Sequence, residues 1–454
     1  MRHYFGTDGI RGRANRAPMT ADLALRLGMA LVEQFRTQHE KPRIVVGKDP
    51  RVSGYVFEMA VSAGITAMGG HVWLTGPLPT PGIAFVTRSM RADAGVVISA
   101  SHNPFDDNGL KVFDRQGFKL SDEVEEQLEQ RMDDPDLAAR TADGTHLGRA
   151  FKIDDAVGRY VVYLKNAFPQ HLTLEGRRIV LDCAHGAAYK VAPLVFEELG
   201  ATVIRMGCEP DGVNINRGVG ALYPEGVQRS VVEHGADLGV CLDGDADRVI
   251  LVDEKGEKVD GDRIMAILAL LLREQGRLKR DTIVATSMSN LGLEVWARQN
   301  GFQLLRTDVG DRYVVERLRE DGLNLGGEQS GHVIALDVST TGDGVLAALL
   351  VLAAMGEWKR PLSALPAGLK RYPQELKNVR VAEKIPFDDV AGLRELEAQF
   401  AREVGERGRL VLRYSGTEPL ARVMVEAEDE RVVRAWTTRF ARHLESAIGE
   451  GGQR

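Results

Sequence analysis

The sequence predicts an α/β protein with three homologous α/β domains, each built on a mixed sheet, and a smaller C-terminal α+β domain. The main observation is a repeated pattern. A short apolar, β-branched run precedes a stretch with helical periodicity and a second apolar run, and this order occurs three times. The length of 454 residues agrees, because at roughly 150 residues per domain it predicts about three domains.

Each repeat predicts a strand, a helix and a second strand, with a glycine closing the helix. The first copy places these elements at 44–46, 55–68 and 71–74, with Gly70 as the closing glycine. The second and third copies place them at 179–181, 191–199 and 201–204, with Gly200, and at 283–285, 291–299 and 302–305, with Gly301. Three unrelated α/β units remain the alternative, because the copies share little sequence.

Composition indicates where these units are joined. A polar stretch at 131–149, a charged turn at 253–257 and a proline-rich stretch at 360–373 are the candidate connections. We therefore expect domains at 1–150, 151–253, 254–366 and 367–454. The last domain is expected to run strand, helix, strand, strand, helix, which is typical of an α+β fold: 378–381, 390–404, 410–413, 421–426 and 430–447.

Charge and composition limit the compartment and the partners. Lys and Arg total 58 and Asp and Glu total 65, a net charge of −7, which disfavours broad binding to nucleic acid or to an anionic membrane. The longest apolar run, 345–355, is too short for a membrane span of about 20 residues, and the first eight residues lack the apolar core of a signal peptide. Three cysteines without CxxC spacing predict no disulfide framework. We expect a cytoplasmic protein without nucleic-acid or membrane partners.

The strongest motif places three carboxylates directly after the apolar run 238–242: Asp243, Asp245 and Asp247. Alternating carboxylates on one side of an extended chain repel one another unless a cation neutralises them, and oxygen-only ligands suit Mg²⁺. A calcium EF-hand is the competing interpretation, since Glu254 would be the last ligand of such a loop. However, Arg248 stands where that loop needs glycine, and strands rather than helices flank it. A solvated acidic turn is the other alternative, which the position directly after a buried strand disfavours.

A second motif places two serines, a histidine and an Asn-Pro turn after the predicted strand 94–97. The segment lacks the Gly-x-Ser-x-Gly elbow of a serine hydrolase. His102 is not expected to act as a base for Ser101, because adjacent side chains diverge. A hydroxyl that accepts a phosphoryl group beside Mg²⁺ fits better, with a plain Ser/Asn turn as the alternative.

Two further loops combine glycines with polar groups. In the loop 326–332, Glu and Ser could bind sugar hydroxyls and His could transfer protons. The segment 413–419, with Arg422 beyond it, supplies a basic fork, two hydroxyls and exposed backbone, which suits a phosphate. A structural glycine turn and solvated arginines are the respective alternatives. Loops 6–12 and 307–312 are weak signals by themselves.

Five motifs in this order make the whole chain similar to the α-D-phosphohexomutase superfamily, and within it to bacterial enzymes that act on glucosamine phosphates: 5–12, 98–111, 243–248, 327–332 and 413–419. The resemblance implies four domains round a central cleft, with a mobile fourth domain. It implies that glucosamine 6-phosphate becomes glucosamine 1-phosphate through a phosphoserine and a 1,6-bisphosphate, which supplies amino sugar for cell-wall precursors.

The resemblance also implies roles for individual residues. Ser101 would be the phosphoserine, and Mg²⁺ would be bound by its phosphate together with Asp243, Asp245 and Asp247. Lys111, Arg11 and Arg248 would surround the transferring phosphate, with Lys111 and His332 as acid/base candidates. Glu328 and Ser330 would bind the sugar hydroxyls, and the non-reacting phosphate would be bound by Arg413, Ser415, Gly416 and Thr417, with Arg422 nearby.

Two alternatives to this function stay open. Within the superfamily, a phosphoglucomutase/phosphomannomutase would act on glucose or mannose phosphates. Outside it, the chain could be a catalytically silent metal- or phosphosugar-binding protein, although binding alone needs no phosphorylatable Ser101. A hexose or glucosamine 1,6-bisphosphate is expected as activator and intermediate, and a homodimer stays open as the assembly.

Overall fold

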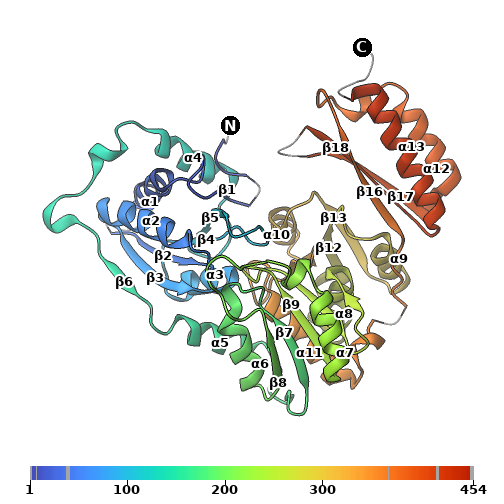
Figure 1. Cartoon of the computed structure of the whole chain (residues 1–454), viewed down its shortest axis with the longest axis horizontal. Coiled ribbons are helices and arrows are strands. Elements are labelled where there is room, and N and C mark those ends of the chain that lie inside the picture. Colours follow the sequence, from blue (N-terminus) through green and yellow to red (C-terminus); the bar gives the residue numbers. More distant parts are fainter. Residues whose placement is uncertain (1–2, 7, 37–40, 367, 416–418, 450–454) are drawn as a thin grey trace. The chain divides into compact units, whose positions relative to one another are not determined.

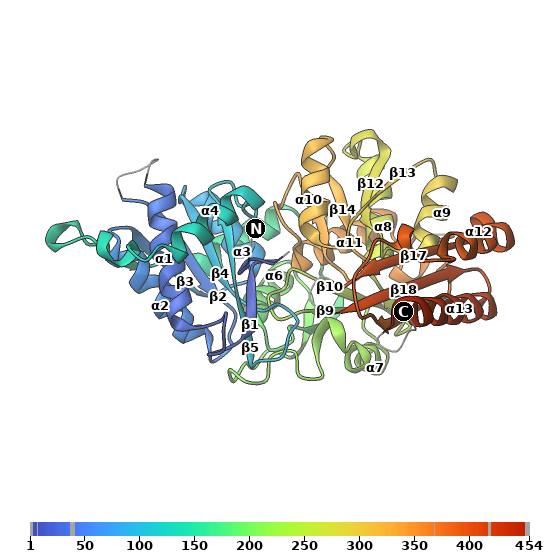
Figure 2. The ribbon, with the colours of Figure 1, turned by 90° about the horizontal axis from the view of Figure 1, so that it is seen from above.

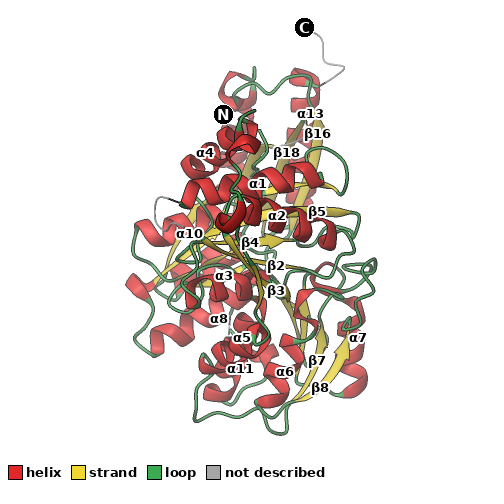
Figure 3. Ribbon diagram, turned by 90° about the vertical axis from the view of Figure 1, so that its left-hand side faces the viewer, coloured by secondary structure: helices red, strands yellow, loops and turns green. Residues whose placement is uncertain are grey.

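The computed structural model describes residues 3–6, 8–36, 41–366, 368–415 and 419–449. The chain divides into two compact units, and the colours of Figure 1 follow the sequence through both. Unit 1 comprises Met1–Thr286 and Leu305–Pro366, and unit 2 comprises Ser287–Leu304 and Ala367–Arg454. The helices and strands bear out the predicted multi-domain α/β fold class, because strands and helices alternate along the chain. Figure 3 shows the two kinds of element in different colours.

The first sheet of unit 1 has six strands in the order β1-β5-β4-β2-β3-β6. Its strands are β1 (Ile10–Arg13), β2 (Arg43–Lys48), β3 (His71–Pro77), β4 (Ala94–Ile98), β5 (Asp107–Asp114) and β6 (Ala150–Lys152). The helices that follow in this region are α1 (Ala21–Phe35), α2 (Gly54–Ala67), α3 (Thr80–Ser89), α4 (Asp122–Asp133) and α5 (Ala156–Asn166). Apolar side chains of α1 and α2 pack against the buried strands β2 and β4 and form one continuous core.

The second sheet has the order β11-β10-β9-β7-β8 and the third has the order β13-β12-β14-β15. The second contains β7 (Arg178–Asp182), β8 (Thr202–Met206), β9 (Leu238–Leu242), β10 (Val249–Asp253) and β11 (Lys258–Val259), with α6 (Val191–Glu198) and α7 (Glu225–His234). The third contains β12 (Thr282–Thr286), β13 (Gln303–Thr307), β14 (Leu325–Gly327) and β15 (Val333–Ala335), with α8 (Gly261–Glu274), α9 (Leu291–Gln299), α10 (Asp311–Glu320) and α11 (Gly344–Trp358).

A common four-strand arrangement recurs in the three sheets. The orders β5-β4-β2-β3, β10-β9-β7-β8 and β15-β14-β12-β13 are the same arrangement with different strands. In each sheet, the last two of these four strands in sequence order pair antiparallel: β4 with β5, β9 with β10 and β14 with β15. Figure 2 shows β9 and β10 side by side. This shared order supports the repeat that the sequence predicts over three related units.

The ends of α2, α6 and α9 share one type of backbone hydrogen bond. The N–H of the second residue after each helix cap reaches back to a carbonyl five residues earlier: Gly70 to Ile65 (3.0 Å), Ala201 to Phe196 (3.0 Å) and Phe302 to Ala297 (2.8 Å). Gly200 and Gly301 adopt the positive φ that this turn needs, as expected. For α2 the prediction of Gly70 is wrong by one residue, because Gly69 has the positive φ of 89°.

Unit 2 contains α9 and the C-terminal part of the chain. Its sheet has the order β16-β18-β17, all antiparallel. The elements are β16 (Gln374–Arg380), α12 (Leu393–Val404), β17 (Gly408–Tyr414), β18 (Leu420–Ala427) and α13 (Glu430–Ile448), in the predicted order strand, helix, strand, strand, helix. Both long helices cover the sheet with apolar side chains around Phe400, Trp436 and Phe440.

The apolar run 345–355 forms most of α11, and every residue in it is buried. No helix in the described part of the chain has both the length and the apolar character needed to cross a membrane. Asp343 caps α11 by accepting the N–H of Leu346 (3.0 Å), and it also accepts the hydroxyl of Tyr160 (2.5 Å). Burial raises the pKa of Asp343 to about 6.

We expect the raised pKa of Asp343 to make stability fall as pH rises. Between the ordinary carboxyl value and about 6, the folded chain binds more protons than the unfolded chain, so its free energy of unfolding decreases across that window. Asp343→Asn removes the charge: its Oδ1 can still accept the N–H of Leu346, while its Nδ2 faces the Tyr160 hydroxyl as a donor. Between pH 5 and pH 7, the free energy of unfolding should therefore fall by about 1–2 kcal/mol less in the variant than in the unchanged chain.

Thermal unfolding at the two pH values measures this difference. Asp260→Asn is the matched control, because Asp260 caps α8 in the same way, through the N–H of Arg263 (3.2 Å). Parallel pH profiles for Asp343→Asn and the unchanged chain would contradict the expectation.

Candidate functional site

Three of the predicted polar loops occupy the same place in the three related sheets. Loop 99–106 joins β4 to β5, loop 243–248 joins β9 to β10, and loop 328–332 joins β14 to β15. All three lie in unit 1. The flanking elements are strands, which excludes the EF-hand interpretation of the acidic loop.

Ser101 meets the acidic loop directly. Its Oγ donates to Asp243 Oδ2 (2.7 Å), and only 1% of the residue is exposed. Its backbone has a positive φ of 52°, which is uncommon for a residue other than glycine. The Ser101 N–H donates to Ser99 Oγ (2.9 Å), which places both serines of the motif in one buried turn.

The expectation that His102 diverges from Ser101 is wrong. His102 Nδ1 lies 3.3 Å from Ser101 Oγ, because the left-handed backbone at Ser101 turns the two neighbouring side chains toward the same side. Burial, followed by the positive charges of Arg248 and Arg11, lowers the pKa of His102 to about 4. A neutral imidazole therefore contacts the serine hydroxyl.

The predicted carboxylate triad forms a site that fits a divalent cation. One oxygen from each of Asp243, Asp245 and Asp247 lies within 4.8 Å of the others, and all three residues are buried. Burial and the other two carboxylates raise the pKa of Asp243 well above its usual range. Oδ1 of Asp245 and Oδ1 of Asp247 are buried and have no hydrogen-bond partner among the described residues. Unsatisfied oxygens of a hard donor type are what Mg²⁺ and similar ions bind.

Lys111 reaches this triad from β5. Its Nζ lies 2.8 Å from Asp245 Oδ2, 3.3 Å from Asp247 Oδ2 and 3.2 Å from Asp8 Oδ2. Burial by itself would lower the pKa of Lys111, but these carboxylates outweigh it and raise the pKa well above the ordinary value. The ammonium group is therefore held charged in a buried position.

Arg11 and Arg248 add two more cations. Arg11 lies on β1, opposite Gly109 of β5, and its guanidinium contacts Asp8. The Arg248 N–H donates to Asp243 Oδ1 (3.2 Å). The Nε atoms of both arginines are buried without a hydrogen-bond partner in the described part of the chain. Such donors are suited to an anionic ligand.

His332 is fully enclosed between two carboxylates. Its Nε2 lies 3.3 Å from Asp311 Oδ2, and its Nδ1 lies 3.7 Å from Asp247 Oδ1. Burial would lower the pKa of His332, but Asp311 and Asp247 outweigh it and raise the pKa to about 9. The N–H of Gly342 also points at Nε2 (3.1 Å), a contact that favours the neutral ring, but two full negative charges outweigh one amide dipole.

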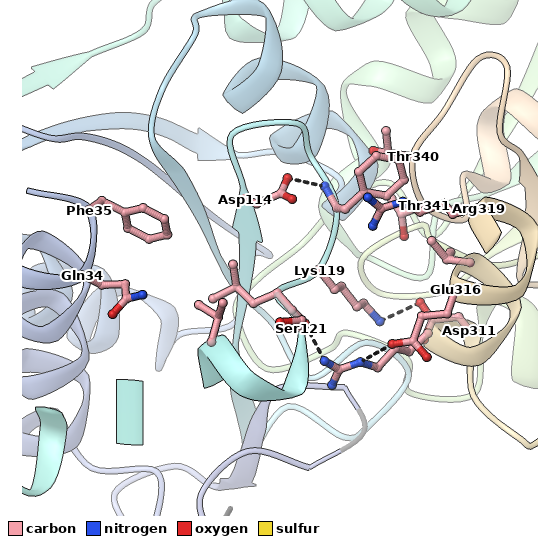
Figure 4. Close-up of a pocket in the computed structure, with 15 residues that line it drawn as sticks. Gln34, Phe35, Asp114, Lys119, Ser121, Asp311, Glu316, Arg319, Thr340 and Thr341 are labelled. Carbon is pink, nitrogen blue, oxygen red and sulfur yellow. Dashed lines mark hydrogen bonds and ion pairs between the residues drawn. The ribbon is translucent and has the colours of Figure 1, made fainter. Parts of the chain in front are cut away.

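Sequence reasoning missed the ion pairs that connect these groups. Lys119 Nζ lies 2.6 Å from Asp311 Oδ2 and also contacts Asp8, so a chain of charges runs from Arg11 to His332. Lys119 and Asp311 line a cavity of about 470 Å³. Figure 4 shows the two side chains facing one another. Thr80 was missed as well, and its hydroxyl donates to Asp245 Oδ2 (2.7 Å). Asp8 and Asp311 stand in loops that the sequence marked as weak signals, whereas nothing in the sequence singled out Lys119 or Thr80.

Glu328 and Ser330 are neighbours in the third loop. Glu328 is 8% exposed and accepts the N–H of Gly310 at Oε1 (3.2 Å), while Ser330 Oγ donates to Glu328 Oε2 (3.3 Å). Ser330 is exposed. The pair thus places a buried carboxylate beside an exposed hydroxyl.

The fourth predicted motif lies in unit 2. Arg413 on β17 and Arg422 on β18 are directly opposite in the ladder, and burial together with Arg422 lowers the pKa of Arg413. Ser415 is buried, and its carbonyl accepts Lys384 Nζ (2.6 Å). Gly416 and Thr417 lie outside the described residues. Two guanidinium groups thus stand opposite each other on neighbouring strands, which agrees with a phosphate site.

Gly342→Ala is expected to displace His332 and to lower the pKa of its ring from about 9 toward the ordinary value. A Cβ at this position would lie 2.3 Å from His332 Nε2, 2.5 Å from its Cδ2 and 2.7 Å from the Asp247 carbonyl oxygen. The ring must therefore move away from Asp247 and Asp311. An NMR titration of the His332 ring measures this change, with Gly158→Ala as control because a Cβ there meets open space. An unchanged pKa of His332 in Gly342→Ala would contradict this placement of the ring.

The four domain models of the phosphoglucomutase/phosphomannomutase family match the chain in order. Alpha/beta/alpha domains I, II and III match residues 2–139, 158–256 and 260–372, and the C-terminal domain matches residues 376–443. A curated protein named phosphoglucosamine mutase from Nitratidesulfovibrio vulgaris is 56% identical over 447 residues, 98% of this chain and 99% of that protein. One of the same name from Citrifermentans bemidjiense is 54% identical over 449 residues, 99% of each chain.

Solved structures agree with this fold. A phosphoglucomutase/phosphomannomutase family protein from Burkholderia thailandensis matches with a TM-score of 0.80 at 26% identity, covering 100% of this chain and 99% of that one. The N-acetylphosphoglucosamine mutase of Aspergillus fumigatus, solved in complex with GlcNAc-6P and magnesium, matches in fold with a TM-score of 0.72 at 18% identity. That match covers 98% of this chain and 96% of that one.

Proposed function

The chain belongs to the phosphoglucomutase/phosphomannomutase family, and we propose that it is an isomerase that interconverts glucosamine 6-phosphate and glucosamine 1-phosphate. The observation that carries this proposal is the 2.7 Å hydrogen bond from Ser101 Oγ to Asp243 in the buried carboxylate triad. The preference for the amino sugar rests on relatives named phosphoglucosamine mutase, which are 53% to 56% identical over nearly the full length.

The proposed metal is Mg²⁺, held by Asp243, Asp245 and Asp247 together with a phosphate oxygen on Ser101. The ion would neutralise negative charge on the transferring phosphoryl group. Phosphorylation would add about −1.5 to −2 charge at Ser101, directly beside Asp243. The buried carboxylates and the phosphate would then repel strongly, which is why a cation belongs with the phosphorylated form.

In the proposed reaction, Ser101 gives its phosphoryl group to the free hydroxyl of the bound sugar phosphate. The P–O bond to Ser101 breaks, a P–O bond to the sugar oxygen forms, the sugar hydroxyl loses its proton to a base, and Ser101 Oγ regains a proton. The resulting 1,6-bisphosphate turns round and returns its other phosphoryl group to Ser101. A bound hexose or glucosamine 1,6-bisphosphate would also serve as activator by phosphorylating Ser101.

Lys111, His332, Arg11 and Arg248 are the proposed groups around the transferring phosphate. Their cationic forms are supported by the carboxylates that surround Lys111 and His332, which raise the pKa values of both groups. Protonated Lys111 and His332 can each give a proton to a departing oxygen. The unpartnered Nε atoms of the two arginines can donate to phosphate oxygens.

Sugar and phosphate recognition is proposed for two groups of residues. Glu328 and Ser330 in unit 1 would bind the sugar hydroxyls. The non-reacting phosphate would be bound by the unit 2 residues Arg413, Ser415, Gly416, Thr417 and Arg422. The opposed positions of Arg413 and Arg422 in the ladder between β17 and β18 support an anion site there.

We also propose the four domains at 1–150, 151–253, 254–366 and 367–454, which the order of the four matching family domains supports. A cytoplasmic enzyme that supplies amino sugar for cell-wall precursors is the proposed setting. We also propose that the protein has no nucleic-acid or membrane partner and that it forms a homodimer.

A coupled assay with three substrates tests the specificity. We expect kcat/KM to be higher with glucosamine phosphate than with glucose or mannose phosphate, because the relatives of highest identity carry the amino-sugar name. Higher kcat/KM on glucose or mannose phosphate would instead assign the activity of a phosphoglucomutase/phosphomannomutase. No turnover of any of the three by the metal-supplemented chain would leave a binding protein as the better description.

A further inference from the structure

Arg51, which no motif singled out, is fully buried next to the Ser101 loop. A guanidinium has five N–H donors, and here every one of them is used. Nε donates to Asp49 Oδ2 (2.8 Å), Nη2 donates to the carbonyls of Ser101 (2.9 Å) and Asn103 (2.8 Å), and Nη1 donates to the carbonyls of Asp107 (3.0 Å) and Pro104. One side chain thus binds four carbonyls within residues 101–107, in the Ser101 loop and at the start of β5.

Asp49 connects the same pair to the backbone N–H of Ser101. Its Oδ2 accepts the hydroxyl of Ser99 (2.7 Å), and Ser99 Oγ accepts the N–H of Ser101 (2.9 Å). Both backbone groups of Ser101 are therefore bound to the Arg51–Asp49 pair, the carbonyl directly and the N–H through Ser99. A left-handed backbone at a serine costs free energy, so it persists only where the surroundings hold it in this way.

Asn216, in the neighbouring domain, also binds the Ser101 loop. Asn216 Nδ2 donates to the carbonyls of Ser101 (2.8 Å) and Asn103 (3.0 Å), which are two of the carbonyls that Arg51 binds. A Cβ at Gly244 would lie 2.5 Å from the Ser101 carbonyl oxygen and 2.8 Å from Asn216 Nδ2. The acidic loop therefore packs directly on this point, so a shift of the Ser101 carbonyl changes the position of Ser101 Oγ relative to Asp243.

We propose that Arg51 is the positioning residue of the reaction. It fixes the left-handed turn that points Ser101 Oγ at Asp243, and Asn216 supports it from the second domain. This role rests on the proposed function, because it assumes that Ser101 carries the phosphoryl group. Arg51 has no donor left for a substrate or a phosphate, so it acts through the loop alone. Phosphoryl transfer depends on in-line placement, and a misplacement of about 1 Å costs about 100-fold in rate.

Arg51→Lys tests the proposal, because an ammonium keeps the charge but has three donors on one atom and cannot span four carbonyls. We expect kcat to fall about 100-fold, with KM for the sugar phosphate changed less than about threefold. The rate at which glucose 1,6-bisphosphate phosphorylates Ser101, read by mass spectrometry, should fall by a similar factor. Asn216→Ala should give a smaller fall, about tenfold, in the same direction.

Arg263→Lys is the matched control. Arg263 also binds three carbonyls of one turn, those of Leu365 (2.7 Å), Leu362 (3.0 Å) and Ser363 (3.1 Å), but it does not contact the Ser101 loop. This variant should lose comparable thermal stability and keep its rate of Ser101 phosphorylation. A purely structural role for Arg51 would make the two lysine variants alike in both measurements.

The outcomes separate this proposal from the proposed function. An unchanged phosphorylation rate in Arg51→Lys, or a raised KM with unchanged kcat, would overturn the positioning role. If Arg51→Lys does not fold, wild-type kinetics in Asn216→Ala would overturn it. An unchanged chain that is phosphorylated on Ser101 but does not turn over glucosamine phosphate would contradict the proposed substrate and leave the positioning role standing.

Discussion

Ser101→Ala is expected to lose mutase turnover by about 10⁴-fold or more, because removal of a covalent nucleophile removes the pathway and not just one contact. The change deletes a single oxygen, the one that lies 2.7 Å from Asp243 Oδ2. Alanine tolerates the backbone of this position about as well as serine does, and the Ser101 N–H and carbonyl contacts are unaffected. The turn should therefore stay folded while the chemistry stops.

Two measurements check this result. Steady-state turnover gives the loss, and intact-protein mass spectrometry should find about 80 Da of added mass on a fraction of the unchanged chain and none on the variant. Ser89→Ala, at the exposed end of α3, is the matched control and should keep both signals. Turnover in Ser101→Ala at the rate of the unchanged chain would contradict the phosphoserine mechanism.

The parts of this site that the sequence predicts are local. Alternating carboxylates directly after an apolar run predict the acidic loop, and the structure places that loop between β9 and β10. The same holds for the serine motif after β4. The three related units share one strand order, so these loops occupy the same hairpin in each unit. A repeat in the sequence can indicate such an arrangement.

The parts that the sequence does not predict depend on contacts between distant segments. Lys119 pairs with Asp8 across 111 residues and with Asp311 across 192 residues, and a lysine on a helix-preceding loop gives no sign of either partner. Arg51 and Asn216 act on carbonyl groups, which every residue has, so no side-chain pattern marks their target. The contact between His102 and Ser101 was missed because the serine carries a backbone conformation that its residue type does not indicate.

Asp243→Asn is expected to have two opposite effects, one on activity and one on stability. Activity should fall by about 1,000-fold or more, since the variant loses one carboxylate of the metal triad next to Ser101. The metal-free protein should become more thermostable. Ionised Asp243 is disfavoured in the fold by burial and by Asp247 and Asp245, which raise its pKa well above the usual range. A neutral amide of the same shape removes that repulsion.

Thermal unfolding with and without Mg²⁺ separates these effects. A ligand at 100 times its Kd stabilises the folded state by about 2.7 kcal/mol, so the unchanged chain should gain stability on addition of Mg²⁺ and lose it with a chelator. Asp243→Asn should unfold at a higher temperature than the unchanged chain without metal and should respond little to Mg²⁺.

Asp237→Asn is the matched control. Asp237 directly precedes β9, whereas the triad follows it, and Asp237 pairs with Arg177 (2.8 Å). It should leave the response to Mg²⁺ intact. A full Mg²⁺ response in Asp243→Asn would show that the ion binds elsewhere. A lower thermal midpoint of the metal-free variant would show that Lys111 and Arg248 already balance the three carboxylates, because then the loss of one negative charge would leave buried cations in excess.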